Sequence, residues 1–257
     1  MPGPKFVIHT EAEIEGIRRA AQAAARVLDG VCQSVRPGLS TLDLDRTARR
    51  LIEDAGGKSA FHGYRGFPGQ LCISLNDEVV HGIGRADRIL KPGDLVSLDV
   101  GVCLDGCIGD TARTVCVVAA PSPEAERLLR ITQESLEAGI AAARGGNGVN
   151  DIGRAVEATV RRAGFSVVRD FVGHGCGLEL HEPPEVPNFS QMTRGALLRP
   201  GMVLAVEPMV NVGTHRVTVD PDGWTVRTAD GRLSAHFEHM ILITRNRPEI
   251  LTWLRTA

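Results

Sequence analysis

Four acidic residues stand within or beside apolar segments of the chain, where a charged side chain needs a partner. Asp99 follows the apolar residues 95–98, and Asp110 lies a short distance further along the chain. Glu207 is part of VLAVEPMV, and Glu238 comes just before the apolar residues 240–243. Burying an unpaired carboxylate costs several kcal/mol. These positions therefore point either to ion pairs or to metal cations held by carboxylate oxygens.

The first two carboxylates are predicted to lie on one hairpin. The dipeptide Asp105-Gly106 is a strong signal for a two-residue hairpin turn. Counting outward from that turn places Asp99 opposite Ala112, so that Asp110 shares a face with Asp99 on the diagonal. A diagonal pair has its Cα atoms about 7 Å apart, which suits two carboxylates that converge on cations. A β-bulge between these positions would break the register.

The second pair of carboxylates belongs to an internal repeat. LKPGDLVSLDV (residues 90–100) aligns without a gap with LRPGMVLAVEP (residues 198–208), which matches Asp99 with Glu207. HGIG (residues 81–84) echoes HGCG (residues 174–177) in the same way. A repeat of this kind predicts two similar halves, at about residues 10–119 and 122–246, related by a pseudo-twofold axis. We expect the four carboxylates to meet at that axis.

Carboxylates that close together repel one another and take up protons unless cations balance them. One or two divalent cations are the simplest way to keep all four ionised, although any single one could instead cap a turn or pair with an arginine. His174, between two glycines, is a candidate fifth ligand. Such an oxygen-rich set with one imidazole suits Mn²⁺, Fe²⁺, Co²⁺ or Zn²⁺. Bridging carboxylates can hold two ions about 3.5–4 Å apart, as in hydrolytic two-metal sites.

The elements that must position these residues follow the same repeat. Thr10 and Glu13 form a capping box that predicts a helix to about residue 35, and Thr41 is the expected N-cap of a second helix that ends at residues 56–57. The second half repeats the plan, with a helix from Pro123 to about residue 144 and a shorter helix over residues 151–163. Helices followed by strands in each half predict an α+β fold built around one shared sheet.

Composition excludes several classes of protein. The 257 residues carry a formal charge of −2 and are 43% hydrophobic and 23% charged, which is typical of a globular protein and gives no basic field for nucleic acid. No apolar run is long enough to cross a membrane, and the N-terminus resembles neither a signal nor a transit peptide. We therefore expect a cytoplasmic protein that forms a single catalytic domain over residues 1–257, with its six cysteines unpaired.

Several motifs together resemble those of the type I methionine aminopeptidases. They are CISLNDEVVHG, LDVGVCLDGCIGDTART, GHGCG, HEPPEVPNF, AVEPM and HFEH. The resemblance implies the pita-bread fold, in which two pseudo-symmetric α/β halves share a curved antiparallel sheet with the helices outside. It also implies two divalent ions per chain (Co, Mn, Fe or Zn). Asp99 would bind one ion, His174 and Glu207 the other, and Asp110 and Glu238 would bridge both.

The activity that the resemblance implies is removal of the initiator methionine from nascent proteins and peptides when the second residue is small. A hydroxide that bridges the two cations would attack the first peptide bond, with Glu207 moving the proton and His81 and His181 beside the substrate. The methionine pocket would be lined by Phe61, Tyr64, Phe67, Cys72, Leu180 and Trp224. Leu180 and Phe61 stand where many bacterial members carry Phe and Cys. Nascent chains are the implied partners, together with association with the ribosome and a monomeric state.

Two alternatives have the same fold. Xaa-Pro aminopeptidases and prolidases share the five ligands but usually carry an additional N-terminal domain, and a metal-free binding protein of this fold would have lost ligands. Among the remaining residues, we expect His236 to share the face of Glu238 and line the entrance of the site, and His239 to point away. His9, His62 and His215 are expected to be solvated, and Trp253 to anchor the packing of the C-terminal segment.

Overall fold

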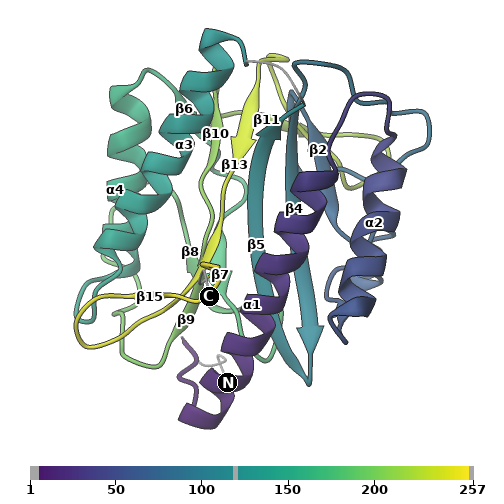
Figure 1. Ribbon diagram of the computed structural model, residues 1–257. Helices are drawn as coiled ribbons and strands as arrows, with labels where there is room; N and C mark the ends of the chain where they lie inside the picture. The colour runs from purple at the N-terminus through teal and green to yellow at the C-terminus, as the bar shows by residue number, and fades with distance from the viewer. Residues whose placement is uncertain (1–5, 118–120, 255–257) are drawn as a thin grey trace.

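The computed structural model describes residues 6–117 and 121–254 of the chain, and its four α-helices lie close to the predicted positions (Figure 1). Thr10 and Glu13 form the predicted capping box of the first helix. The second helix is capped by Ser40 and not by Thr41, because the Ser40 hydroxyl accepts from the Asp43 amide while the Asp43 carboxylate accepts from the Ser40 amide. The helices are α1 (Glu11–Ser34), α2 (Thr41–Asp54), α3 (Pro123–Ala142) and α4 (Val149–Arg162).

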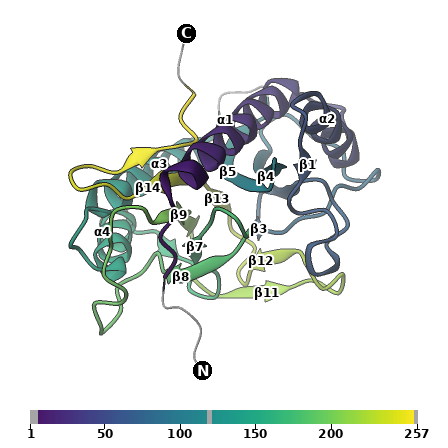
Figure 2. The same ribbon diagram turned by 90° about the horizontal axis from the view of Figure 1, so that it is seen from below.

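The strands of the first half form an antiparallel sheet around one long hairpin. Strand β4 (Leu95–Leu104) pairs along its whole length with β5 (Cys107–Cys116), and its other edge pairs with β1 (Lys58–Ser59) and β2 (Cys72–Leu75). A short 3₁₀ helix, η1 (Tyr64–Gly66), follows β1. Helices α1 and α2 cover one face of this sheet, and Figure 2 shows the hairpin of β11 (Val217–Val219) and β12 (Val226–Thr228) on the opposite side of β4 and β5.

The remaining strands form a five-stranded sheet and two smaller sheets, and all of these strands except β3 belong to the second half. The larger sheet has the order β15-β14-β9-β7-β8, and the smaller ones have the orders β13-β10-β6 and β11-β12-β3. The strands are β3 (Glu78–Val80), β6 (Ser166–Val167), β7 (Gly173–Gly175), β8 (Glu182–Val186), β9 (Val203–Val206), β10 (Met209–Asn211), β11 (Val217–Val219), β12 (Val226–Thr228), β13 (Ser234–His236), β14 (His239–Leu242) and β15 (Glu249–Ile250).

Strand β5 joins the two halves. The hydroxyl of Thr114 donates to the carbonyl of His236, and the amide of Glu238 donates to the carbonyl of Ala112. These hydrogen bonds lie between the β4–β5 hairpin of the first half and residues 236–238 of the second. The carboxylates that were predicted on the two halves are thereby brought together along one seam.

Matching hydrogen bonds recur in the two halves at the spacing of the sequence repeat. Ser40 forms an isolated bridge with Ile89, and Gly148 forms one with Leu197. Each residue of the second bridge lies 108 positions after its counterpart in the first, which is the offset of the sequence alignment. This connection before the second helix of each half is therefore the same in both halves. The single-domain organisation and the exact limits of the repeat stay predictions.

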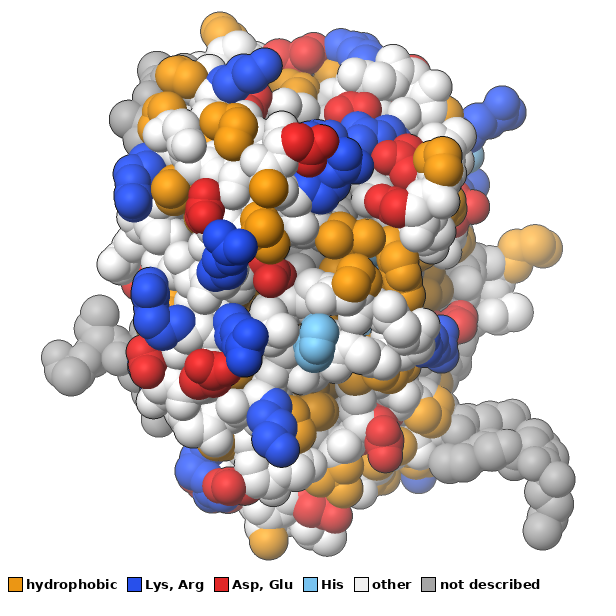
Figure 3. All heavy atoms as spheres, turned by 90° about the vertical axis from the view of Figure 1, so that its right-hand side faces the viewer, with side chains coloured by type: hydrophobic (Ala, Val, Ile, Leu, Met, Phe, Trp, Pro, Cys, Tyr) orange, Lys and Arg blue, Asp and Glu red, His pale blue; other side chains and the backbone are white. Residues whose placement is uncertain are grey.

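The surface agrees with the balanced composition. On the face that carries α2, acidic and basic side chains are interspersed with apolar ones (Figure 3). Among the described residues, no helix combines the length and the apolar character that crossing a membrane requires. No disulfide joins any of the six cysteines, all of which lie within the described residues.

Candidate metal centre

The β4–β5 hairpin has the predicted register. Asp99 pairs with Ala112, and Asp110 pairs with Gly101, so no bulge interrupts the hairpin between them. Asp99 and Asp110 consequently lie on one face, on the diagonal of the antiparallel pair. On the second half, Glu207 lies between β9 and β10, and Glu238 lies between β13 and β14. All four carboxylates line the same cavity.

His174 faces these carboxylates with one defined nitrogen. Its Nδ1 lies 2.9 Å from the carbonyl oxygen of Gly175, which can only accept a hydrogen bond, so Nδ1 carries the proton of the neutral ring. Its Nε2 lies 3.3 Å from Oε1 of Glu207 and 3.9 Å from Oδ2 of Asp110. A lone pair therefore faces two carboxylate oxygens, an arrangement that a cation would satisfy. Ligand atoms of Asp110, His174 and Glu238 lie within 4.8 Å of one another.

No lysine or arginine in the described parts of the chain forms an ion pair with any of the four carboxylates. Buried oxygens of three of them lack a hydrogen-bond partner: Oδ1 of Asp99, Oδ1 of Asp110 and Oε1 of Glu207. The alternative of ordinary ion pairs or turn caps does not account for these atoms. The donor set, four carboxylates and one imidazole, fits divalent cations.

Burial and mutual repulsion raise the pKa values of the four carboxyl groups. Burial raises the pKa of Asp99 to about 7. The pKa values of Asp110, Glu207 and Glu238 are raised well above the ordinary carboxyl range, first by burial and then by the neighbouring carboxylates. Without cations the cluster holds protons at neutral pH, and cations would have to displace them.

Three further histidines lie in or beside this cavity. His81 follows β3 with a left-handed backbone (φ of 59°), and its ring meets Phe171 edge-on with centroids 5.3 Å apart. Burial lowers the pKa of His81 to about 4, so its ring is neutral at pH 7. His181 lies at the mouth of the cavity, where its ring is 4.2 Å from the ring of His174 and its Nδ1 is 2.9 Å from the hydroxyl of Tyr64.

The prediction for His236 was right about its face and wrong about its depth. It shares the cavity with Glu238, but it is 1% exposed and lies beside Glu207, with its Nε2 3.7 Å from Oε2 of that residue. The alternation of side chains along a strand predicted the correct face of β13, but it does not predict how deeply a side chain on that face is buried. His236 is therefore an interior neighbour of Glu207 and does not line the entrance.

The predicted substrate wall surrounds a cavity of about 250 Å³. Trp224 packs edge-on against Phe67 with centroids 5.2 Å apart, and Phe61 covers Gly101 so closely that a Cβ there would meet its ring at 2.4 Å. All six predicted wall residues contribute to the lining: Phe61, Tyr64, Phe67, Cys72, Leu180 and Trp224. The sequence reasoning missed Phe171 and Met209, which also line it. Both residues are close in sequence to predicted metal ligands: Phe171 comes just before GHG, and Met209 comes just after Glu207-Pro208. This proximity could have identified them as lining residues.

Other sequence expectations have mixed outcomes. His239 points away from the cavity, as predicted, and its Nδ1 lies 2.8 Å from the Thr252 hydroxyl. His9 is not solvated: it is 5% exposed, and its Nε2 lies 3.1 Å from Oε2 of Glu182, a residue far away in the sequence. Trp253 is 58% exposed, but it packs against the ring of His239 and does not line the substrate cavity.

Comparison with known proteins supports the same chemistry. Residues 15–245 match metallopeptidase family M24. Methionine aminopeptidase from Clostridium perfringens is 49% identical over 97% of this chain and 100% of its own length, and the one from Aquifex aeolicus is 45% identical over 96% and 98%. The structure of methionine aminopeptidase from Thermotoga maritima superposes with a TM-score of 0.93 at 42% identity, covering 96% of this chain and 99% of that one.

A prolidase from Pyrococcus furiosus shares the fold alone, with a TM-score of 0.78 at 22% identity and coverage of 97% of this chain and 66% of the prolidase. Its likeness supports the pita-bread architecture, two pseudo-symmetric halves around antiparallel strands, but it says nothing of substrate. The methionine aminopeptidases match both in sequence and over almost their whole length. The chain belongs to metallopeptidase family M24 and, within it, to the methionine aminopeptidases.

Proposed function

We propose that this enzyme removes the initiator methionine from polypeptides whose second residue is small. The observation that carries the proposal is the convergence of four carboxylates and His174, none of them paired with lysine or arginine in the described structure, beside a cavity walled by apolar and aromatic side chains. A methionine side chain is apolar, unbranched and adaptable in shape, which suits such a wall. The reaction is hydrolysis of the first peptide bond.

The residues that would hold two divalent cations are those named from the sequence. Asp99 would bind one ion, His174 and Glu207 the other, and Asp110 and Glu238 would lie between them. Bound cations would lower the pKa of a water molecule and polarise the scissile carbonyl. Co²⁺, Mn²⁺, Fe²⁺ and Zn²⁺ all suit this donor set. The number of ions and their identity are part of the proposal.

The side chains of the cavity supply the remaining steps. With the Tyr64 hydroxyl donating to Nδ1 of His181, the Nε2 atom of His181 carries the proton and can donate to the substrate carbonyl oxygen as it gains charge. His81, neutral at pH 7, can hydrogen-bond the amide of the bond that breaks. Glu207, whose carboxylate lies in the same cavity, can carry a proton from the attacking water to the leaving amine.

The setting of the reaction follows from its substrate. We propose that nascent chains are the physiological substrates and that the enzyme acts as a monomer in the cytoplasm, where it associates with the ribosome. The balanced charge argues against nucleic acid as a direct partner.

A peptide panel tests the proposal. Met-Ala, Met-Gly, Met-Ser and Met-Pro peptides should be cleaved far faster than Met-Lys or Met-Leu, and Ala-Pro should resist. Equal rates across the methionine series would contradict the requirement for a small second residue. Preferential cleavage of Ala-Pro would favour a prolidase instead. Metal analysis of protein purified without added metal should show divalent ions in the wild type, and a protein that binds none would contradict the metal-dependent mechanism.

A further inference from the structure

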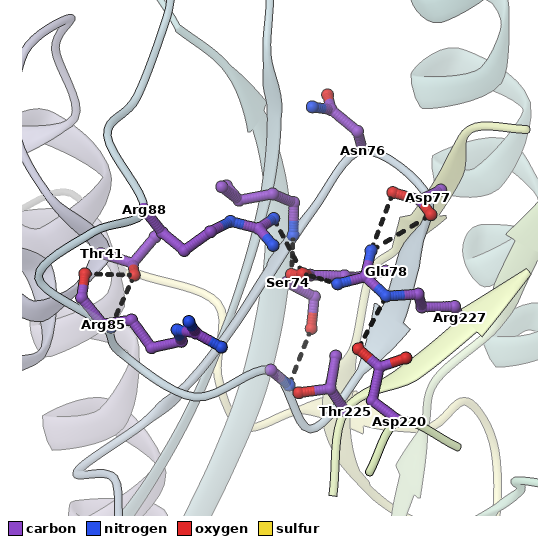
Figure 4. Close-up of polar contacts among 12 residues, drawn as sticks. Thr41, Ser74, Asn76, Asp77, Glu78, Arg85, Arg88, Asp220, Thr225 and Arg227 are labelled. Atoms are coloured by element: carbon purple, nitrogen blue, oxygen red, sulfur yellow. Dashed lines mark hydrogen bonds and ion pairs between the residues drawn. The ribbon is translucent and has the colours of Figure 1, made fainter. Parts of the chain in front are cut away.

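Beside the cavity, a buried acidic residue is held by two arginines. Glu78 in β3 is 5% exposed. Its Oε1 accepts from Nη2 of Arg88 at 2.8 Å and from Nη2 of Arg227 at 2.7 Å, and its Oε2 accepts from the amide of Leu75 at 2.7 Å (Figure 4). Both carboxylate oxygens are thus satisfied by charged or backbone donors. Hydrogen bonds of this kind are shorter and stronger than neutral ones.

Arg227 in β12 is the centre of this cluster. Its Nη1 lies 3.1 Å from both oxygens of Asp77, its Nε lies 2.7 Å from Oδ2 of Asp220, and its Nη2 contacts Glu78 (Figure 4). One planar guanidinium therefore connects three carboxylates from two separate parts of the chain. A lysine could not reproduce this fork, because its ammonium group is a single point of charge.

The connected segments carry residues of the substrate cavity. Glu78 lies three positions before His81, and Arg88 lies seven positions after it, so the ion pair between them closes the loop that holds His81. Asp220 and Arg227 flank the turn between β11 and β12, and that turn carries Trp224. The rings of His81 and Trp224 meet edge-on inside the cavity, with centroids 6.4 Å apart.

The backbone at His81 needs such support. A left-handed conformation is uncommon for a residue with a side chain, and it persists only where the surroundings hold it. Gly82, the next residue, lies so close to the carbonyl of Ile73 that a Cβ there would be 2.1 Å from the oxygen. The segment is wedged against β2 on one side and tied to β12 through Glu78 and Arg227 on the other.

We propose that Arg227 is a positioning residue that fixes Trp224 relative to His81 and thereby sets the selectivity of the cavity for the unbranched methionine side chain. This inference rests on the proposed function. Arg227 does not line the substrate cavity itself, and it acts through the two rings. Misplacing a binding group by about 1 Å can lower a rate about 10²-fold.

The test compares Arg227→Met with Arg227→Lys, each in a Trp253→Phe background so that Trp224 is the only tryptophan. Arg227→Met should shift the emission of Trp224 in metal-free protein, lower kcat/KM for Met-Ala peptides about 10²-fold and narrow the preference for Met-Ala over Leu-Ala. Arg227→Lys should recover part of each effect. The matched control is Arg232→Met, which removes an exposed arginine near the same hairpin, one that pairs with Glu124.

The outcomes separate this inference from the proposed function. If Arg227→Met changes Trp224 emission and Met/Leu selectivity no more than Arg232→Met does, the cluster is purely structural and the inference is wrong, whatever the change in melting temperature. If Arg227→Met does not fold, Asp220→Asn, which removes one contact of Arg227, decides by the same two readouts. If the wild type fails to cleave Met-Ala while the emission of Trp224 shifts as expected, the proposed function fails and the positioning role stands.

Discussion

The Nδ1 atom of His181 lies 2.9 Å from the hydroxyl oxygen of Tyr64, and the two rings stack with centroids 5.3 Å apart. Tyr64 belongs to η1 in the first half of the chain, whereas His181 follows β7 in the second. This contact links the two halves of the chain through two residues that line the cavity. It also fixes which nitrogen of His181 is free to face the substrate.

Tyr64→Phe should lower kcat about fivefold and leave the metal content unchanged. The substitution keeps the stacked ring but removes one hydrogen bond, whose net contribution is about 1 kcal/mol. Steady-state kinetics on a Met-Ala peptide measure the effect. In a His181→Ala background the same substitution should have no further effect on kcat, because its partner is gone. Additive effects in that double variant would show that Tyr64 acts independently of His181.

Asp110→Asn should weaken the binding of both metal ions, whereas Asp99→Asn should mainly weaken the binding of one. A neutral amide bridges cations poorly. A carboxylate oxygen of Asp110 lies within 4.8 Å of ligand atoms of both His174 and Glu238. Metal content after dialysis and a metal titration of activity distinguish the two variants. Two tightly bound ions and normal turnover in Asp110→Asn would rule out its bridging role.

His174→Ala and His81→Ala should separate the two histidines that the repeat matches. His174→Ala should lose metal and activity together, because the ring nitrogen that faces Glu207 and Asp110 is removed. His81→Ala should keep its metal and lose about 10²- to 10⁴-fold in rate, the range for a positioned acid–base group. Metal analysis beside kinetics provides the comparison. Loss of metal from His81→Ala, with metal retained in His174→Ala, would reverse the two roles.

Local sequence signals predicted the features that depend on local geometry. The Asp105-Gly106 turn gave the register that pairs Asp99 with Ala112, because a two-residue turn leaves only one way to align the strands. The repeat brought Glu207 into the same argument as Asp99. Helix positions followed from capping residues, with an error of one residue at Ser40, where two adjacent hydroxyl residues both suit an N-cap.

Features that depend on distant partners could not be read from the sequence. His9 is buried because Glu182, from the other half of the chain, lies against it. His236 lies beside Glu207 in the interior because β13 pairs with β10, a pairing that strand alternation does not specify. The cluster around Arg227 joins residues about 150 positions apart in the sequence. Each of its members is a charged residue of a type that is usually exposed, so none of them stands out in the sequence.

The metal-free protein should become less stable as the pH rises from about 6.5 to about 8. A carboxyl whose pKa is raised on folding contributes stability that is complete below its unfolded pKa, about 4, and is lost as the pH rises through its folded pKa. That folded pKa is about 7 for Asp99, and the pKa values of Asp110, Glu207 and Glu238 are also raised well above the ordinary range.

Over this pH range the opposing effect of the buried histidines fades, because their unfolded pKa is about 6.5. Burial lowers the pKa of His81 to about 4 and those of His174 and His236 to about 3, so these rings favour folding above the unfolded value of about 6.5 and lose that contribution only at lower pH. Thermal unfolding after chelation should therefore show a melting temperature that falls from about pH 6.5 to about pH 8, and added Mn²⁺ should flatten the trend because cations replace the protons. Asp99→Asn should reduce the slope in metal-free protein, since it removes one of the titrating carboxyls. A melting temperature of the metal-free wild type that is constant or rises over this range would show that the four carboxylates do not share protons in the folded state.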